Sequence, residues 1–435
     1  MSAPSASPQW FGQPRGLTIL FLTQMWEIFS YYGMRVLLVY YMTKQLLMEQ
    51  QHASLVYGIY VATFYFTPIL GGIVADRWLG KRRAVIIGAA IMSLGHFLMA
   101  SESLLYPALA AIAVGNGLFL PSLPSQVDGL YAKDDPRRGS AYNVYYVGIN
   151  VGGLLAPLVC GTLGEVYGWH WGFGAAGIGM LLGLAVYVLG GRYLPKEAPP
   201  GREVEAVQPE AAGSGSDMAM RIRVLAAIAL CVMLFRGAYE QIGNTIALWA
   251  DSGIDRGLGA LTIPMTWFQS INPFLIIALT PLFLAVWTRR AKQGREPSSA
   301  QKMASGAFVV ASAYLLLYVV AASSPAGQVS WVWLALFFAV LTVGELMILP
   351  VGLGLFARLA PARFRATTVA AWFFASFGGN LLAGYLGTFW SRLGPASFFL
   401  LMAALATAAG MLLWLLAGPS RQIEGGGRTE TGVRV

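Results

Sequence analysis

The sequence predicts an all-α membrane protein with twelve transmembrane helices in two halves of six. Of its 435 residues, 57% are hydrophobic and 11% are charged, whereas a soluble domain carries roughly 25% charged residues. Long apolar runs recur along the chain, and the basic residues gather in alternate loops between them. This composition and patterning exclude a soluble protein, because lipid is the solvent that suits most of the chain.

Twelve stretches are long and apolar enough to span a bilayer as helices, which takes about 20 residues each. They are expected at residues 17–43, 53–76, 84–101, 104–131, 140–162, 169–190, 222–250, 262–288, 303–322, 329–357, 366–390 and 396–417.

A polar segment between the sixth and seventh stretches is rich in Pro, Gly, Glu and Ser and has almost no aromatic residues. This composition is typical of a flexible linker. It divides the chain into an N-terminal tail, a six-helix bundle, a linker, a second six-helix bundle and a C-terminal tail. Their expected limits are 1–16, 17–190, 191–220, 221–418 and 419–435.

The net charge of +9 has a topological explanation. The loops on one side of the predicted spans hold most of the basic residues, whereas the opposite loops carry only Lys44, Arg256 and Arg392. By the positive-inside rule, both termini and the linker are cytoplasmic, in a bacterial inner membrane. The start of the chain lacks the pattern of a cleavable signal peptide. No nucleic-acid partner is needed to explain the charge.

Other chemistries leave no pattern in this sequence. The three histidines show no metal-ligand spacing, and no nucleophile–His–acid arrangement or phosphate-binding loop is evident. We therefore expect neither an enzyme nor a cofactor or metal ion, and protons remain as a possible coupling ion.

The segment GGIVADRWLGKRR, at Gly71–Arg83, resembles the loop between the second and third helices of the major facilitator superfamily. A basic loop alone would satisfy topology, but this arrangement of glycines, Asp and basic residues goes beyond it. The resemblance implies two six-helix bundles and a conformational-switch loop. The residues assigned to that loop are Gly71, Asp76, Arg77, Gly80 and Arg82.

Further segments narrow the resemblance to the proton-dependent oligopeptide transporter (POT/PTR) family. They are FSYYGMR at 29–35, GNGLFLPS at 115–122, VGINVGGLLAPLVCG at 147–161, IPMTWFQSINP at 263–273, GELMILPVGL at 344–353 and LAPARF at 359–364. The resemblance implies a central cavity that opens alternately to each side. It also implies proton-driven import of di- and tripeptides by a monomer.

Three positions depart from the family pattern. The first helix of the family carries Glu-x-x-Glu-Arg, whereas this chain has Gln24, Glu27 and Ile28 in those places. A lysine of the fourth helix is Leu120 here. Three ionisable groups linked to coupling and to binding of the substrate carboxylate are thus absent, so the family's coupling machinery is not carried over intact.

Five charged residues fall inside apolar stretches: Glu27, Arg35, Arg236, Glu240 and Glu345. A charge in the bilayer is costly and therefore indicates function. Three acids and two bases leave one unbalanced negative charge, which suits a proton or a substrate ammonium group. Glu27 is either a structural acid or the remaining protonation site.

Arg236 has two interpretations. It either forms a local i,i+4 pair with Glu240 or replaces the missing lysine and meets a substrate carboxylate. At 1.5 Å per residue, Arg35 and Glu240 lie at similar depths, about 7 and about 6 Å past the midpoints of their helices. A pair between these two residues would hold the outer mouth shut, as the resemblance implies.

The resemblance also assigns residues to the substrate cavity. Tyr31, Tyr32 and Arg35 follow Glu27 on the first helix, and Glu345 corresponds to the acid that meets a peptide amino terminus. The other expected lining residues are Tyr65, Asn150, Asn272 and Trp372. Asparagine both donates and accepts, as a peptide does. The plainer alternatives are interhelical hydrogen bonds for the two asparagines and packing for Tyr65 and Trp372.

The expected function is secondary transport of peptides or peptide-like compounds by alternating access. Proton symport through Glu27, Glu240 or Glu345, uncoupled movement, and a changed substrate with another coupling all stay open. Two other functions stay open as well: transport or export of a different amphiphile or drug, and a receptor or scaffold that does not transport.

Overall fold

The computed structural model describes the backbone of residues 9–10, 12–132, 135, 137–195, 197, 215–324, 327–359 and 365–426. Side chains are described for these residues except 139–140, 215–219, 357–359, 365–370, 422 and 424–426. The predicted linker 191–220, the tails 1–16 and 419–435 and the loop motif 359–364 therefore lie in whole or in part outside the described residues.

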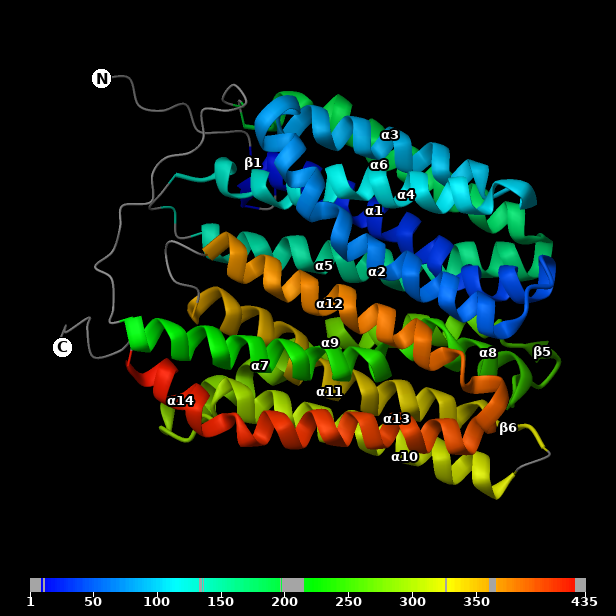
Figure 1. Cartoon of the computed structure of the whole chain (residues 1–435). Coiled ribbons are helices and arrows are strands. Elements are labelled where there is room, and N and C mark those ends of the chain that lie inside the picture. The colour runs from blue at the N-terminus through cyan, green and yellow to red at the C-terminus, as the bar shows by residue number, and fades with distance from the viewer. Residues whose placement is uncertain are drawn as a thin grey trace, which may run out of the picture. The chain divides into compact units, whose positions relative to one another are not determined.

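The described residues contain twelve helices of 18 residues or more, which confirms the expected all-α membrane fold (Figure 1). They are α1 (Arg15–Tyr40), α2 (Gln50–Val74), α3 (Lys81–Leu98), α4 (Leu105–Ser122), α5 (Arg138–Ala156), α6 (Trp169–Leu189), α7 (Gly215–Tyr239), α9 (Phe268–Lys292), α10 (Ser299–Ser323), α11 (Trp331–Leu359), α12 (Arg365–Gly387) and α13 (Trp390–Leu415). Two shorter helices are α8 (Thr245–Ser252) and α14 (Ala417–Gly426).

Nine spans in the described part of the chain are long and apolar enough to cross a membrane by length and composition. They include all the long helices except α1, α3 and α12. α1 carries Glu27 and Arg35 within its length, and α3 begins with three basic residues at 81–83. In α1 and α3, these charged residues lower the mean hydropathy of the run, whereas α12 carries one charged residue, Arg365, at its start.

Two compact units make up the chain, and each is described by itself. Unit 1 comprises residues 1–46 and 66–205, and unit 2 comprises residues 47–65 and 206–435. In unit 1, α1 packs against α5 and α6, and α3 packs against α4 and α6. In unit 2, α10 packs against α11 and α13, and α7 packs against α12 and α13 (Figure 1).

Helix α2 is divided between the units after Tyr65. Its first part approaches α12 so closely that a Cβ added to Gly58 would lie 2.3 Å from the Cα of Gly384. Its second part approaches α4, where a Cβ on Gly71 would lie 2.0 Å from the carbonyl oxygen of Gly117. Only glycine permits backbones this close, as is common where membrane helices pack.

Uncharged polar side chains also join the first part of α2 to the rest of unit 2. Ser54 Oγ donates to Asn244 Oδ1 at 2.9 Å, and Gln50 Nε2 donates to Ser54 Oγ at 2.7 Å and to the carbonyl oxygen of Gly387 at 3.0 Å. Ser54 and Asn244 are fully buried. This part of α2 is thus held by hydrogen bonds as well as by close packing.

The seventh predicted span, 222–250, falls within one candidate membrane span, Met220–Ser252, but its helix is interrupted. α7 ends at Tyr239, a 3₁₀ turn covers Glu240–Gly243, and α8 begins at Thr245. Asn244, at φ −116° and ψ −97°, leaves the helical conformation between them. Next to the break, Gln241 Nε2 donates to the carbonyl oxygen of Ala383 at 2.9 Å and so joins the turn to α12. Hydropathy did not detect the break, because the apolar residues on both sides of it keep the mean hydropathy of the span high.

Short strands complete the described elements. They pair as β1 (Gln9–Trp10) with β2 (Gln13–Pro14), antiparallel; β3 (Ile254–Asp255) with β6 (Val329–Ser330), parallel; and β4 (Gly257–Leu258) with β5 (Leu261–Thr262), antiparallel. The helix α14, which the sequence analysis did not predict, contacts α10, α13 and α7, and its Arg421 donates to Gln301 Oε1 on α10 at 3.0 Å.

Candidate functional site

Glu27 on α1 is fully buried in unit 1 and has uncharged partners. Gln24 Nε2 donates to Glu27 Oε2 at 2.7 Å, and Gln24 Oε1 accepts a hydrogen bond from the Tyr145 hydroxyl on α5. Gln24 and Tyr145 are also buried. Glu27 Oε1 is buried and has no hydrogen-bond partner among the described residues. One carboxylate oxygen is therefore held in place, and the other is left for a further partner.

Three residues that follow Glu27 on α1 form a second group in unit 1. The Arg35 guanidinium carbon lies 6.0 Å from the ring centroid of Tyr31 and 5.7 Å from that of Tyr32. The two rings meet edge to face at 5.3 Å. Arg35 is 5% exposed. The aromatic faces thus give partial electrostatic compensation to a buried cation.

Three other unit 1 positions within the helices, Asn150, Ile28 and Leu120, carry no charge. Asn150 Nδ2 donates to the carbonyl oxygen of Tyr146 on its own helix at 2.9 Å, so that this hydrogen bond does not join two helices. Ile28 is buried against α5, where a Cβ on Gly152 would lie 3.2 Å from the Ile28 Cβ. Leu120 is half-buried on α4. Ile28 thus fills its position by packing.

Unit 2 holds a buried ion pair on α7 and the turn that follows it. Arg236 Nη1 donates to Glu240 Oε1 at 2.6 Å, and the side chains are 7% and 2% exposed. The guanidinium also lies 5.1 Å from the ring centroid of Tyr65 on α2. This is the local i,i+4 pair that was one of the two interpretations of Arg236. Arg35 belongs to the other unit, and its pairing with Glu240 stays a prediction.

A second buried acid of unit 2 lies on α11. Asn272 Nδ2, from α9, donates to Glu345 Oε2 at 2.5 Å and to Thr342 Oγ1 at 3.0 Å. Glu345 is 8% exposed. A hydrogen bond to a carboxylate is short and strong, so it fixes the position of Glu345. The structure thus brings together two residues, 73 positions apart, that the sequence analysis had named separately.

Trp372 on α12 is 6% exposed. Its ring meets that of Phe356 edge to face at 5.4 Å. A Cβ on Gly352 would lie 2.4 Å from the Trp372 ring. Trp372 therefore packs against α11, and its place in a substrate cavity stays a prediction.

The conformational-switch loop forms a π-helical turn at Ala75–Leu79, in which Asp76 and Arg77 are exposed. Gly80 follows at φ +77°, a conformation that glycine adopts without strain. The carboxylate of Glu197 accepts from the backbone N–H groups of Lys81 and Arg82, the first two residues of α3. Arg82 Nη2 also donates to the carbonyl oxygen of Gly191 at 2.6 Å. The loop is thus joined to the segment that follows α6.

Two buried partners were missed by sequence reasoning. Tyr145 carries no charge and lies 121 residues from Gln24, and no spacing rule relates them. His96 on α3 is fully buried and its Nε2 lies 2.7 Å from Ser30 Oγ on α1. A polar residue inside an apolar run was the available signal for His96, but a single sequence does not reveal which helix it faces.

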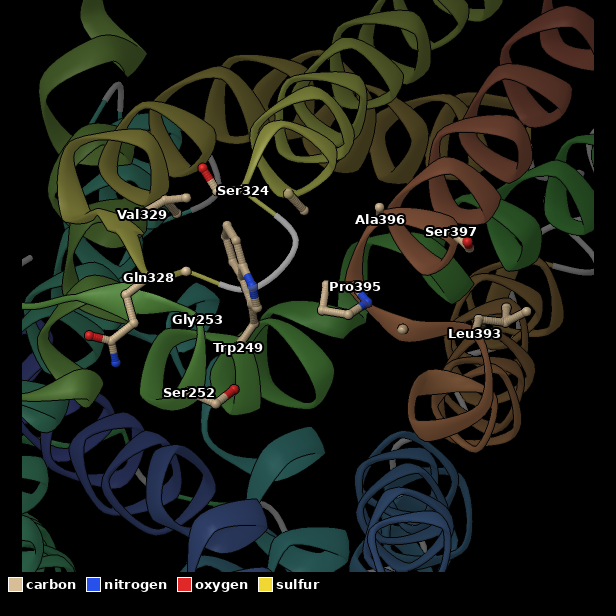
Figure 2. Close-up of a pocket in the computed structure, with 13 residues that line it drawn as sticks. Trp249, Ser252, Gly253, Ser324, Gln328, Val329, Leu393, Pro395, Ala396 and Ser397 are labelled. Carbon is tan, nitrogen blue, oxygen red and sulfur yellow. The ribbon is translucent and has the colours of Figure 1, made fainter.

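A cavity of about 400 Å³ lies in unit 2 beside Trp249. Figure 2 shows side chains around it from α8, from the connection before α11 and from the start of α13. The described lining residues are all uncharged, and none is a residue that the sequence marked as functional. The described residues also contain no group of three His, Cys, Asp or Glu side chains placed to hold a metal ion.

The twelve long helices and the buried charges define a polytopic membrane transporter of the major facilitator type. The chain matches the POT family over residues 82–209 and 215–397, more than half of its length. It belongs to the POT family, as the sequence motifs predicted.

Similar proteins carry related names. The di-/tripeptide transporter of Lactococcus lactis subsp. cremoris is 30% identical over 95% of this chain and 97% of the relative. The peptide transporter YePEPT of Yersinia enterocolitica is 32% identical over 87% of this chain and 88% of the relative. A crystal structure of peptide transporter POT in complex with sulfate has a TM-score of 0.87 and 29% identity and covers 96% of this chain and 97% of that one.

Proposed function

We propose that this protein transports di- and tripeptides or peptide-like compounds across the membrane by alternating access. The observation that carries the proposal is the buried Glu345 carboxylate, held by Asn272 in a chain of the POT family. A buried acid presents a favourable site for an ammonium group, which every unmodified peptide carries at its amino terminus. Relatives named as peptide transporters support this function, and nothing favours export of a drug or a receptor role.

The buried charges of unit 2 support the same function. The Arg236 cation and the Glu240 anion pair at 2.6 Å. Glu345 is then the acid outside this ion pair. Arg236, Glu240 and Glu345 together carry one net negative charge. A peptide amino terminus would balance it. Because the Arg236 guanidinium is paired with Glu240, we do not assign it to a substrate carboxylate.

The proposed substrate class includes peptide-like compounds as well as peptides. A structure of a mutant of peptide transporter POT in complex with alafosfalin has a TM-score of 0.87 with this chain and 29% identity. We propose that the substrate meets Glu345 through its ammonium group, with Tyr65, Asn272 and Trp372 of the same unit as further contacts.

Uptake of a peptide library into proteoliposomes tests the function. We expect accumulation of di- and tripeptides that increases with an inward proton gradient, and the absence of uptake of every peptide would remove the assignment. The Glu345→Gln variant keeps the shape and an acceptor for Asn272 but loses the charge, so we expect a KM at least about tenfold higher, the effect of about 1.4 kcal/mol of lost binding. Glu296→Gln is the matched control, since Glu296 pairs with Lys302 at an exposed site.

Proton coupling is part of the proposal, with Glu27, Glu240 and Glu345 as candidate carriers. We propose import by a monomer with no cofactor and no enzymatic activity. Uptake that is equal with and without the gradient would favour uncoupled movement.

The proposed location is a bacterial inner membrane, with both termini on the cytoplasmic side. A membrane-impermeant maleimide tests the orientation, because the two native cysteines, Cys160 and Cys231, are buried. In intact cells we expect labelling of Arg256→Cys but not of Arg290→Cys, and labelling of both after permeabilisation. The opposite pattern would reverse the topology.

A further inference from the structure

A directed chain of hydrogen bonds reaches Glu27 from α5. The Tyr145 hydroxyl donates to Gln24 Oε1, the oxygen of the side-chain amide, and Gln24 Nε2 donates to Glu27 Oε2 at 2.7 Å. Tyr145 is 5% exposed, Gln24 1% and Glu27 0%. Because the hydroxyl occupies the carbonyl end of the amide, the NH₂ end faces the carboxylate. The bond from Tyr145 thus stabilises the amide orientation that presents an N–H donor to Glu27.

The direction matters because an amide can present either end to a carboxyl group. An N–H donor stabilises the ionised carboxylate, whereas a carbonyl oxygen accepts a hydrogen bond only from the protonated form. A residue that fixes the amide therefore changes the balance between the two forms of Glu27 without touching it.

Glu27 Oε1 has no hydrogen-bond partner in the described part of the chain, although it is buried. Buried polar atoms are nearly always satisfied, and an exception calls for an explanation. A proton on Oε1 removes the charge from this oxygen while Oε2 keeps its bond from Gln24. The geometry thus divides the carboxyl group into a held oxygen and a proton-accepting oxygen.

Other titratable groups around this part of α1 are few. α5 contributes Tyr145 and Tyr142, which interact electrostatically with each other. α3 contributes His96, which bonds Ser30, and the π-helical turn at Pro157–Gly161 contributes the buried Cys160. α6 presents Gly183, where an added Cβ would lie 3.9 Å from the Glu27 backbone nitrogen. Among the described residues packed on α1 here, Glu27 is the one carboxyl group at this position.

We propose that Tyr145 and Gln24 are positioning residues that aim an N–H donor at Glu27 and so set the pH at which transport responds to protons. This inference rests on the proposed transport function. The amide does not titrate, so it cannot share a proton with Glu27 as a second carboxyl group would. Glu27 consequently responds to pH as a single group.

The test is the pH profile of peptide uptake in proteoliposomes. In Tyr145→Phe the amide loses the bond that orients it, and its carbonyl oxygen becomes free to face Glu27. We expect the pH of half-maximal uptake to rise by about one unit, the change that corresponds to a tenfold shift in the protonation balance. Gln24→Leu, which removes the donor, should shift it in the same direction by at least as much.

A matched control exists in the same unit. The Tyr187 hydroxyl donates to the side-chain oxygen Gln126 Oε1 at 2.9 Å, and Gln126 Nε2 donates to the backbone carbonyl oxygen of Ser122 at 3.0 Å. These two hydrogen bonds involve no carboxylate. Tyr187→Phe removes an equivalent bond and should leave the pH midpoint unchanged. If Tyr145→Phe and Gln24→Leu shift the midpoint no more than Tyr187→Phe, the positioning role is wrong.

Gln24→Glu extends the test. Two carboxyl groups at about the distance of the present hydrogen bond would not both ionise readily, and their titrations would be coupled. We expect the pH profile to broaden into two steps. A profile of unchanged shape and midpoint would contradict the role of Gln24.

Failure of this inference is separable from failure of the proposed function. If the wild-type protein takes up no peptide, the function fails, and the hydrogen-bond chain is tested without transport. Dicyclohexylcarbodiimide reacts with protonated carboxyl groups in membrane proteins, so labelling that is lost in Glu27→Gln reports the protonation of Glu27. We expect the same upward shift of the labelling midpoint in Tyr145→Phe, and no shift would overturn the inference.

Discussion

The two units compensate their buried acids in different ways. In unit 1, Glu27 receives an N–H donor from an amide and keeps one oxygen without a partner in the described residues. In unit 2, Glu240 pairs with a full positive charge on Arg236. An amide leaves a carboxyl group able to gain and lose a proton, whereas an ion pair makes protonation expensive, because it strands the cation. Unit 1 thus holds an acid with uncharged partners, and unit 2 holds an acid in an ion pair.

Breaking the ion pair of unit 2 should produce the largest effect. Glu240→Gln leaves the Arg236 cation buried without its counter-charge, and such changes cost about 3–5 kcal/mol. We expect a marked fall in the melting temperature of the purified protein, measured by thermal shift in detergent. The double variant Arg236→Leu with Glu240→Leu should recover most of the loss, and recovery of none would show that the pair contributes more than mutual compensation.

The next effect concerns the second acid of unit 2. Asn272→Leu removes the donor at 2.5 Å from Glu345 Oε2. A hydrogen bond to a charged group contributes about 1.5–3 kcal/mol. We expect weaker peptide binding, by roughly tenfold or more, in a competition uptake assay. Asn272→Asp should be worse, because it places a second acid beside Glu345, and equal affinity of all three proteins would contradict the role of Asn272.

The close approach of α2 to its neighbours can be compared in both units. A Cβ on Gly58 would meet α12 in unit 2, and a Cβ on Gly71 would meet α4 in unit 1. Overpacking typically costs about 1–3 kcal/mol, so Gly58→Ala and Gly71→Ala should each lower the melting temperature. Gly174→Ala on α6, where nothing lies within 4 Å of the added Cβ, is the control that should cause no loss.

The smallest effect is expected for the neutral hydrogen bond between Ser54 and Asn244. A double-mutant cycle with Ser54→Ala and Asn244→Ala should give a coupling of about 0.5–1.5 kcal/mol in chemical or thermal unfolding. Additive losses would mean that the bond at 2.9 Å contributes nothing to stability.

Much of the fold follows from the sequence, because a bilayer demands about 20 apolar residues for each spanning helix. The break after Tyr239 did not follow from it, since hydropathy does not distinguish an α-helical turn from a 3₁₀ turn. The α14 helix was missed because its ten residues carry no long apolar run.

The candidate site was predictable to a similar degree. Glu27, Arg236 and Glu345 stood out as charges in apolar runs, and the Arg236–Glu240 pair follows from i,i+4 spacing. The bonds of Gln24 to Tyr145 and of Asn272 to Glu345 join different helices. Such pairs depend on helix rotation and register, which one sequence does not contain.

The division of α2 has a consequence for how the chain is made. Ser54 finds its partner 190 residues later in the chain, and Gly58 packs against a helix that begins at Arg365. During synthesis, which proceeds from the N-terminus, the first part of α2 is therefore inserted long before α7 and α12 exist to receive it. A fragment that ends in the linker would leave residues 50–65 without these contacts. The first half of the chain therefore needs the second half to complete the packing of α2.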